Sequence, residues 1–338
     1  MDRRDTLLAL LALGATPFAA RAKPVSAKPF RIGLLPGLDD DLGKWPLKKG
    51  VVAVMGQFGW VEGRDFSVFS SGLEYKTENM DQDVRRMVAA DPDVIIALGN
   101  GYAAGVQKLS TSIPIVMWHA GEPVTAGLAN SLARPGKNVT GISTYADAGV
   151  WAKLVELLHD ANPKIKRIGV LWDYVPPFNT RKLAESYLQE IRKAARAYAI
   201  TLHIAEVSRS DQVPAALAQI ETARPDALLS TAGPGIGVGS RAQRIPQFAV
   251  DKRLPLAVDV RWNPLLDPYP MLVYAPSHRE LMGIAVSYVD RILKGAKPAA
   301  LPFQQPLKLE LLVNLKTAKA IGLSVSQALL LRADVVVE

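Results

Sequence analysis

The sequence predicts an α/β protein made of two similar lobes, each a doubly wound parallel sheet, and an internal repeat is the main observation behind this. Three short apolar segments in the first half of the 338-residue chain are repeated in the same order in the second half. The matched pairs are 31–35 with 167–171, 92–96 with 225–229, and 113–116 with 254–257. Each segment is entered by a turn or a charged residue, which is typical of a strand buried on both faces. A chain of this length also divides into two domains that each bury a core.

In the first half, short apolar runs alternate with segments of helical periodicity. We expect strands at 30–35, 66–69, 94–98, 115–118 and 139–143, and helices at 45–58, at 80–90 and from 102 onward. Asp91-Pro92 ends the second helix, because the residue before a proline disfavours the helical conformation. This β-α-β alternation indicates a parallel sheet with helices on both faces.

The second half repeats the plan. We expect strands at 167–171, 202–207, 227–230, 256–260 and 307–313, another beyond Met271, and helices at 180–198, 213–223, 279–293, 317–321 and 325–331. The helix at 180–198 carries an apolar face at spacings of three and four, formed by Leu183, Tyr187, Leu188, Ile191 and Ala195. The segment 294–298 is a clear break, because it combines a glycine with a proline.

Three crossings between the lobes are expected, near residues 143, 270 and 304. The first lobe would then contain 29–143 and 271–304, and the second 144–270 and 305–338. Such a three-crossing hinge changes the angle between two lobes through few backbone dihedrals. The facing lobes would enclose a cleft.

The N-terminus has the three parts of a secretory signal peptide over residues 1–22. Arg3-Arg4 precede the apolar stretch Leu7–Ala15, and Ala20-Arg21-Ala22 fits a cleavage site before Lys23. The pattern around the arginine pair lacks the aromatic residue of a twin-arginine signal, so general secretion is at least as well supported. We expect a soluble periplasmic protein.

The composition excludes several classes of function. The chain has no cysteine, which excludes disulfides, thiolate metal sites and a lipidated N-terminal cysteine. Its formal net charge of +8 is scattered and forms no basic stripe, so we expect no nucleic-acid partner. Four histidines lack metal-ligand spacing, and there is no G-x-S-x-G nucleophile motif. We therefore expect no catalytic residue, metal or cofactor.

Ligands of open α/β sheets bind at the carboxyl ends of the strands, so the residues at those ends are the candidate ligand contacts. In the first lobe these are Pro36, Gly37, Asn100, Gly101, Tyr102, Trp118, His119 and Glu122. In the second lobe they are Trp172, Asp173, Tyr174, Thr231, Gly233 and Asp259, with Tyr274 near the second crossing. Large rings with a few polar groups suit a small-molecule site.

The residue types suggest how a zwitterion would bind. Amides at 100–103 would take its carboxylate, and one of Glu122, Asp173 or Asp259 would take its ammonium. Trp118, Trp172 and Tyr174 would stack on its apolar part. Structural explanations stay open for the same residues: a tight turn at 99–101, helix caps or internal ion pairs for the acids, and core positions for the tryptophans.

The segments 59–63, 114–116, 132–141, 314–323 and 330–334 resemble the sequences of one family of ABC-transporter substrate-binding proteins, the group that includes the tryptophan/tyrosine-binding TrpX-like proteins. The resemblance implies a type I periplasmic-binding-protein fold that acts with a membrane permease and its ATPase. The departures lie at the expected ligand site. The family commonly has Gly-Thr-Pro-Ala-Ala at 99–103, Gly-Asp-Pro-Val at 121–124 and Trp-Asn-Pro at 172–174.

The sequence thus predicts a monomeric periplasmic receptor that captures an amino acid or related zwitterion, possibly aromatic, for an ABC importer. An exported α/β enzyme and a receptor that feeds a membrane sensor are the alternatives. A ligand-sensing repressor domain shares this fold, but it needs an N-terminal DNA-binding motif where this chain has a signal peptide.

Overall fold

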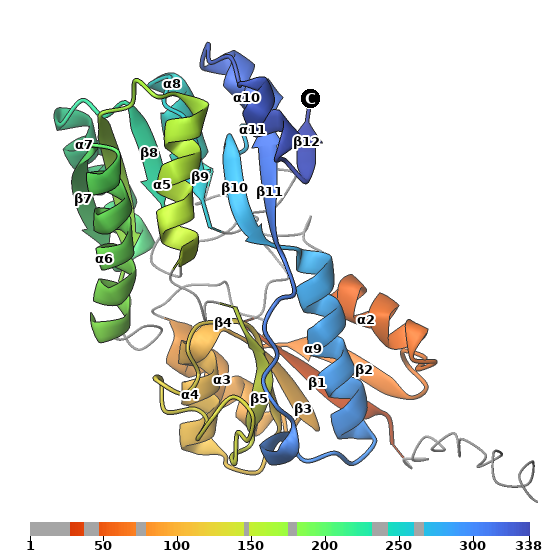
Figure 1. The fold of residues 1–338 in the computed structure, drawn as a ribbon. Helices are drawn as coiled ribbons and strands as arrows, with labels where there is room; N and C mark the ends of the chain where they lie inside the picture. The colour runs from red at the N-terminus through yellow and green to blue at the C-terminus, as the bar shows by residue number, and fades with distance from the viewer. Residues whose placement is uncertain are drawn as a thin grey trace, which may run out of the picture.

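The computed structural model describes residues 28–36, 47–71, 79–144, 149–174, 181–231, 243–259 and 267–338. It contains two separate sheets, which Figure 1 shows in two lobes joined by several chain segments. The predicted signal peptide and two predicted ligand contacts, Gly37 and Gly233, lie outside the described residues.

The first lobe is built on a five-stranded parallel sheet of order β2-β1-β3-β4-β5. Its elements are β1 (Phe30–Leu35), α2 (Leu47–Gln57), β2 (Phe66–Ser70), α3 (Met80–Ala89), β3 (Val94–Leu98), α4 (Gly99–Leu109), β4 (Ile115–Ala120) and β5 (Val139–Ser143). Helices α2 and α9 (His278–Leu293) share one core with the sheet, and α3 and α4 share a second core on the other face. Strands β3 and β5 are almost wholly buried because both faces are covered.

The second lobe is built on a seven-stranded sheet of order β12-β11-β10-β9-β8-β6-β7. Its elements are α5 (Gly149–Ala161), β6 (Arg167–Asp173), α6 (Arg181–Ala197), β7 (Thr201–Val207), α7 (Val213–Thr222), β8 (Ala227–Ser230), α8 (Arg244–Asp251), β9 (Leu256–Val258), β10 (Leu272–Pro276), β11 (Leu309–Asn314), α10 (Leu315–Ala320), α11 (Gln327–Leu331) and β12 (Val335–Val337). Only the β10–β11 pairing is antiparallel. Helices α5 and α6 contribute to one core, and α7 and α8 to the core on the opposite face.

The internal repeat seen in the sequence is also a repeat of backbone contacts. The Arg31 amide donates to Asp93 Oδ2 at 2.7 Å, and the Arg167 amide donates to Asp226 Oδ2 at 2.9 Å. The residue before each Pro-Asp pair has a positive φ, 49° at Asp91 and 46° at Arg224. The two copies therefore begin their first and third strands in the same way, which confirms the prediction of two similar α/β lobes.

The chain passes between the lobes at three places. It leaves β5 for α5, leaves β10 for α9, and returns from the segment around Gln304 to β11. The second crossing lies later than predicted. We expected the first lobe to resume at 271, but β10 pairs with β9 and β11, so 272–276 belong to the second sheet. Strand pairing decides this boundary, because an apolar run such as β10 fits either sheet equally well.

The described part of the chain contains no helix that is both long enough and apolar enough to cross a membrane.

Candidate functional site

The crossings show which edge of each sheet faces the other lobe. Strand β5 ends at the first crossing, and β10 ends at the second. Strands β1 to β4 run parallel to β5, and β6, β8 and β9 run parallel to β10. The carboxyl ends of all these strands therefore lie along one edge of each sheet, which we call the interlobe edge. This edge is where ligands bind in open α/β sheets.

In the first lobe, β3 passes directly into α4 at the interlobe edge. Gly99 makes the turn with a φ of 75°, and the residue that caps the helix is Leu98, whose apolar side chain accepts no hydrogen bond. Asn100 follows. Its side chain is 3% exposed, and its Oδ1 has no hydrogen-bond partner among the described residues. A buried acceptor without a donor is costly, so this position favours a ligand or an ordered water.

The end of β4 brings Glu122 beside the first crossing. The Ser143 hydroxyl donates to the carbonyl of Gly121 at 3.3 Å, which ties this loop to the end of β5. The next residue, Thr144, is 6% exposed, and its Oγ1 also has no partner among the described residues. Burial raises the pKa of the Glu122 carboxyl above its usual value. The carboxylate is thus partly desolvated, a state that a ligand cation would stabilise.

In the second lobe, three aromatic rings form a cluster at the interlobe edge. The Trp151 ring lies 6.0 Å from the Trp172 ring in an edge-to-face arrangement and 5.6 Å from the Tyr187 ring. Trp151 belongs to the first turn of α5, directly after the first crossing, and Trp172 lies near the end of β6. Trp172 is 2% exposed and, like Trp151, belongs to the core that α5 and α6 cover, and its Nε1 donor has no partner among the described residues. We call these three residues the aromatic cluster.

Tyr187 connects the aromatic cluster to carboxylates of both lobes. Burial raises the pKa of its hydroxyl, and the negative charges of Glu122 and Asp259 raise that pKa further. Glu122 belongs to the first lobe, and Asp259, which is 1% exposed, follows β9 in the second. Tyr187 thus lies within the electrostatic influence of one carboxylate from each lobe.

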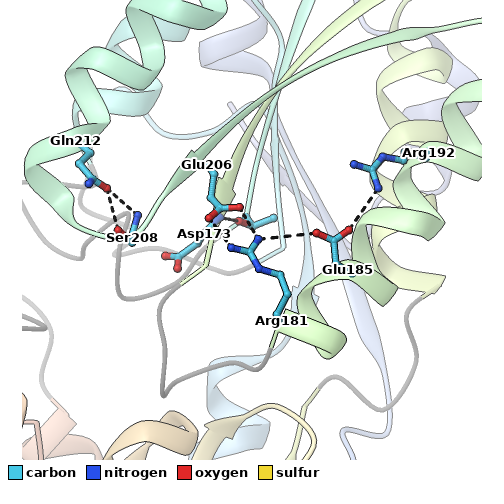
Figure 2. A network of polar contacts seen from close by, with 8 residues as sticks. Asp173, Arg181, Glu185, Arg192, Glu206, Ser208 and Gln212 are labelled. Atoms are coloured by element: carbon cyan, nitrogen blue, oxygen red, sulfur yellow. Dashed lines mark hydrogen bonds and ion pairs between the residues drawn. The ribbon is translucent and has the colours of Figure 1, made fainter.

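Tyr174 is held by a polar network of its own lobe. The Arg181 guanidinium stacks on its ring, with 3.6 Å between Cζ and the ring centroid. The same guanidinium donates two hydrogen bonds to the Glu206 carboxylate, at 2.7 and 3.0 Å, and lies 3.8 Å from Glu185 (Figure 2). The Tyr174 ring also packs against the core under α5 and α6. One face of this ring is therefore covered, which weakens its predicted role as a stacking surface for the ligand.

Three other predicted contacts are engaged in the cores or in the backbone of their lobes. Tyr102 is fully buried, and its hydroxyl donates to Asp83 Oδ2 at 3.3 Å. Trp118 is 3% exposed and belongs to the core that α2 and α9 cover. The Thr231 hydroxyl accepts the amide of Asp173 at 2.8 Å. Tyr102 points into its own lobe, so we remove it from the candidate ligand contacts.

The remaining predicted residues are placed as follows. Pro36, Gly101 and Asp173 are buried at the interlobe edges, and Tyr274 is half-buried on β10 against the core of the second lobe. His119 lies in β4, and its side chain is outside the described part of the structure. As ligand contacts, the predicted residues at these edges stay a prediction.

Sequence reasoning missed three residues of the site: Thr144, Trp151 and Tyr187. Tyr187 falls on the apolar face of its helix, which the periodicity assigns to the core. Trp151 and Thr144 lie next to the predicted first crossing, and that position is a signal that could have found them. Trp151 and Tyr187 lie on helices and not at the carboxyl end of a strand, whereas Thr144 directly follows β5.

The described residues contain no group of three or more side chains suited to holding a metal ion. A groove of about 700 Å³ lies between the end of α5 and the α10–α11 region, and His159, Leu329 and Arg332 are among its lining residues. This groove is at the start of β6, so it lies at the edge of the sheet opposite the interlobe edge. Arg332 crosses it in ion pairs with Glu156 and Asp160, which join α11 to α5.

Comparison with known proteins agrees with this architecture. A tyrosine-binding protein of Clostridioides difficile (strain R20291) is 29% identical over 126 residues, which is 37% of this chain and 36% of that relative. The match thus spans about a third of the relative's length.

Two solved structures share the fold over most of the chain. A protein described as an ABC domain, in complex with L-Trp, from Streptococcus pneumonia has a TM-score of 0.75 at 20% identity. It matches 92% of this chain and 100% of its own. A ligand-free, open substrate-binding protein with adhesive properties from Clostridium difficile has a TM-score of 0.62 at 18% identity, over 92% of this chain and 99% of its own.

The family model for ABC transporter substrate-binding proteins matches residues 48–259, which include all of β3 to β9 and most of the site described above. This range is more than half of the chain, and it agrees with the fold seen in both solved structures. The chain belongs to the ABC transporter substrate-binding protein family.

Proposed function

We propose that this protein is an exported, periplasmic receptor that captures an aromatic amino acid between its two lobes and delivers it to an ABC permease driven by an ATPase. The observation that carries the proposal is the convergence at the interlobe edges. Rings of the second lobe, a carboxylate of the first, and the buried Asn100 Oδ1 and Thr144 Oγ1, which have no partners among the described residues, lie at or beside the carboxyl ends of strands or the first crossing. Rings with a few oriented polar groups are typical of small-molecule sites.

Each part of an amino acid has a matching group. The start of α4 offers amides without a capping side chain, which suit a carboxylate. Glu122, Asp173 and Asp259 are the carboxylates that lie at or near strand ends on the interlobe edges, and one of them would take the ammonium. Trp172 Nε1 and Asn100 Oδ1 offer one donor and one acceptor. The tyrosine-binding relative and the L-Trp complex support an aromatic side chain on the ligand.

Binding would close the lobes if the ligand contacts both of them in the closed form and one in the open form. An affinity near 1 µM corresponds to about −8 kcal/mol, which one buried ring and two charge-assisted contacts supply after ordering costs. The predicted leader at 1–22 supports export, and the family supports the permease and ATPase as partners.

The test is a thermal-shift panel of the proteinogenic amino acids, nucleosides and small organic acids, followed by calorimetry on any compound that stabilises the protein. We expect L-tryptophan or L-tyrosine to raise the melting temperature most, since ligands that bind only the folded state stabilise it. If no amino acid raises the melting temperature, the proposed ligand class is wrong.

Two tryptophan substitutions provide matched variants for the calorimetry. Trp172→Phe removes an Nε1 that no described residue accepts from, so it should lower affinity, and it should also lower stability because it leaves a cavity in the core under α5 and α6. Trp60→Phe removes an Nε1 that donates to Asp290 at 2.7 Å in the core of the first lobe. That variant should lose stability and keep its ligand affinity. Equal affinities for the two variants would argue against Trp172 as a ligand contact.

A further inference from the structure

A buried carboxylate of the first lobe contacts the first turn of α4. Asp83, in the first turn of α3, is fully buried, and its Oδ2 accepts the Tyr102 hydroxyl at 3.3 Å. Its Oδ1 accepts the hydroxyl of Ser71, which directly follows β2, at 2.6 Å. Strand β2 ends at the interlobe edge, and β3 passes into α4 there. The carboxylate therefore joins three chain segments of the first lobe at this edge.

Helices α3 and α4 are also in close contact one turn further along α4. A Cβ at Gly105 would lie 2.9 Å from Val84 Cγ2, so the absence of a side chain at Gly105 lets α4 approach Val84 this closely. Val84 is the neighbour of Asp83 in the sequence, and Val84 and Tyr102 belong to the same core. Packing thus fixes where α4 lies against α3, and the Tyr102 hydroxyl adds a polar contact at its first turn.

The first turn of α4 has little of its own to fix its conformation. Gly99 and Gly101 flank Asn100, and glycine has more backbone freedom than any other residue. Leu98 offers no capping hydrogen bond to the amides of this turn. Tyr102 is the first large side chain of the helix, and it is fully buried. The Tyr102 side chain therefore attaches this turn to the rest of the lobe.

We propose that Asp83 and Tyr102 are positioning residues of the ligand site: their contact holds the start of α4 in the conformation in which its amides and Asn100 Oδ1 receive the ligand. The inference rests on the proposed function, which assigns the ligand carboxylate to these amides, and deepens it. Asn100 Oδ1 is a separate sign that this turn receives a ligand, because it is buried and has no partner among the described residues. Asp83 and Tyr102 act through the turn rather than by contact with the ligand.

Tyr102→Phe removes the hydroxyl and keeps the buried ring. The start of α4 should then sample other conformations in the free protein. A ligand that binds only one of them binds more weakly, because only part of the protein is competent. We expect the affinity for L-tyrosine, measured by calorimetry well below the melting temperature, to fall about 5-fold, the effect of one lost hydrogen bond.

Tyr288→Phe is the matched control. Tyr288 is 1% exposed, and its hydroxyl donates to the Pro302 carbonyl in the same lobe. It belongs to the core on the other face of the sheet, under α2 and α9. Each variant loses one contact of a buried tyrosine hydroxyl, so each should lower the melting temperature. Only Tyr102→Phe should also lower the affinity.

Asp83→Asn tests the same contact from α3. The carboxamide has one acceptor oxygen for the hydroxyls of Ser71 and Tyr102, so the link to α4 should weaken. Removal of a buried charge should raise the stability at pH 7. We therefore expect this variant to bind L-tyrosine more weakly although it melts at a higher temperature. Opposite changes in stability and affinity distinguish positioning from a general loss of folding.

Two further measurements test the role directly. Tyramine lacks the carboxylate that the α4 amides are proposed to bind, so its affinity should change little in Tyr102→Phe. Hydrogen exchange follows the turn without any ligand. In a regular helix the amides of 103–105 donate to the carbonyls of 99–101. These amides should exchange faster in Tyr102→Phe than in the wild type or in Tyr288→Phe.

The outcomes separate this inference from the proposed function. If Tyr102→Phe binds L-tyrosine as tightly as Tyr288→Phe does, or if tyramine loses as much affinity as L-tyrosine, the positioning role is refuted. Unchanged exchange at 103–105 refutes it as well. If neither compound binds the wild type, the amino-acid assignment is refuted, and the exchange measurement still decides whether Tyr102 holds the start of α4.

Discussion

The two lobes share a frame and differ in the side chains that they place at the interlobe edge. In both, the third strand is tied to the first by an aspartate that accepts the amide of an arginine, Asp93 in one lobe and Asp226 in the other. The first strand of each also carries a glycine at the same place, Gly33 and Gly169, where a helix packs closely. The frame is thus set by backbone contacts that both copies keep.

At the interlobe edge the lobes diverge. The first lobe places a bare helix start with Asn100 and a desolvated Glu122 there. The second places the aromatic cluster there, with Trp151 in contact with both of the other rings. The side chains singled out in the first lobe are therefore polar, and those of the cluster are aromatic and largely buried.

The largest effect on stability is expected from substitutions at Gly33 and Gly169, the two glycines that the lobes share. A Cβ at Gly169 would lie 2.3 Å from Ile220 Cγ2, and one at Gly33 would lie 2.4 Å from Met87 Sδ. Isoleucine is stiff at χ1, whereas methionine adapts its shape. Gly169→Ala should therefore lower the free energy of unfolding by about 2 kcal/mol, and Gly33→Ala by about 1 kcal/mol or less.

Urea unfolding of both alanine variants beside the wild type measures the difference. Equal losses would show that the helix, and not its contacting side chain, decides the cost at both sites.

The second prediction concerns Asp83, a buried acid on α3 of the first lobe. Asp83 is fully buried in the first lobe and accepts hydrogen bonds from Ser71, at 2.6 Å, and from Tyr102. Burial raises its pKa despite these two hydroxyls. In the folded state Asp83 therefore binds a proton more tightly than in the unfolded chain. Its contribution to stability falls as pH rises from the ordinary aspartate pKa through the raised folded value.

Asp83→Asn keeps the shape and removes the charge. Relative to the wild type, it should raise the free energy of unfolding at pH 7 by about 1 kcal/mol. The difference between the two proteins should shrink as pH falls through that window. Thermal melts from pH 4 to pH 8 provide the measurement, and a difference that grows on acidification would contradict the assignment.

The smallest effect concerns the exposed ion-pair network of the second lobe. Arg181 and Glu206 are 48% and 43% exposed, so solvent screens their pair even though the hydrogen bonds are bidentate. Arg181→Ala should change the melting temperature little. It should, however, free one face of Tyr174, which the guanidinium now covers.

Arg181→Lys is the matched variant, because it keeps the charge and loses the planar fork. Acrylamide and hydrogen-exchange probes of the Tyr174 region would show greater access in both variants. Unchanged access in Arg181→Ala would mean that the core contacts alone hold the ring.

The sequence by itself determined the duplicated α/β plan, because strands buried on both faces and the Pro-Asp turns before them leave a readable pattern. It also located Asn100, Glu122, Trp172 and Asp259 at the interlobe edges, since these residues directly follow strands or lie at their ends. The end of each strand is a local property of the chain.

Only the tertiary structure decided which of these residues meet. Tyr102 and Tyr187 are both helical tyrosines, yet the hydroxyl of one donates to Asp83 in its own core and the ring of the other packs on Trp151 of a neighbouring helix. The packing of a helix on a sheet sets the direction of such a side chain, and the sequence spacing does not encode it. The place of β10 was settled in the same way, because strand partners are long-range contacts that a local apolar run leaves open.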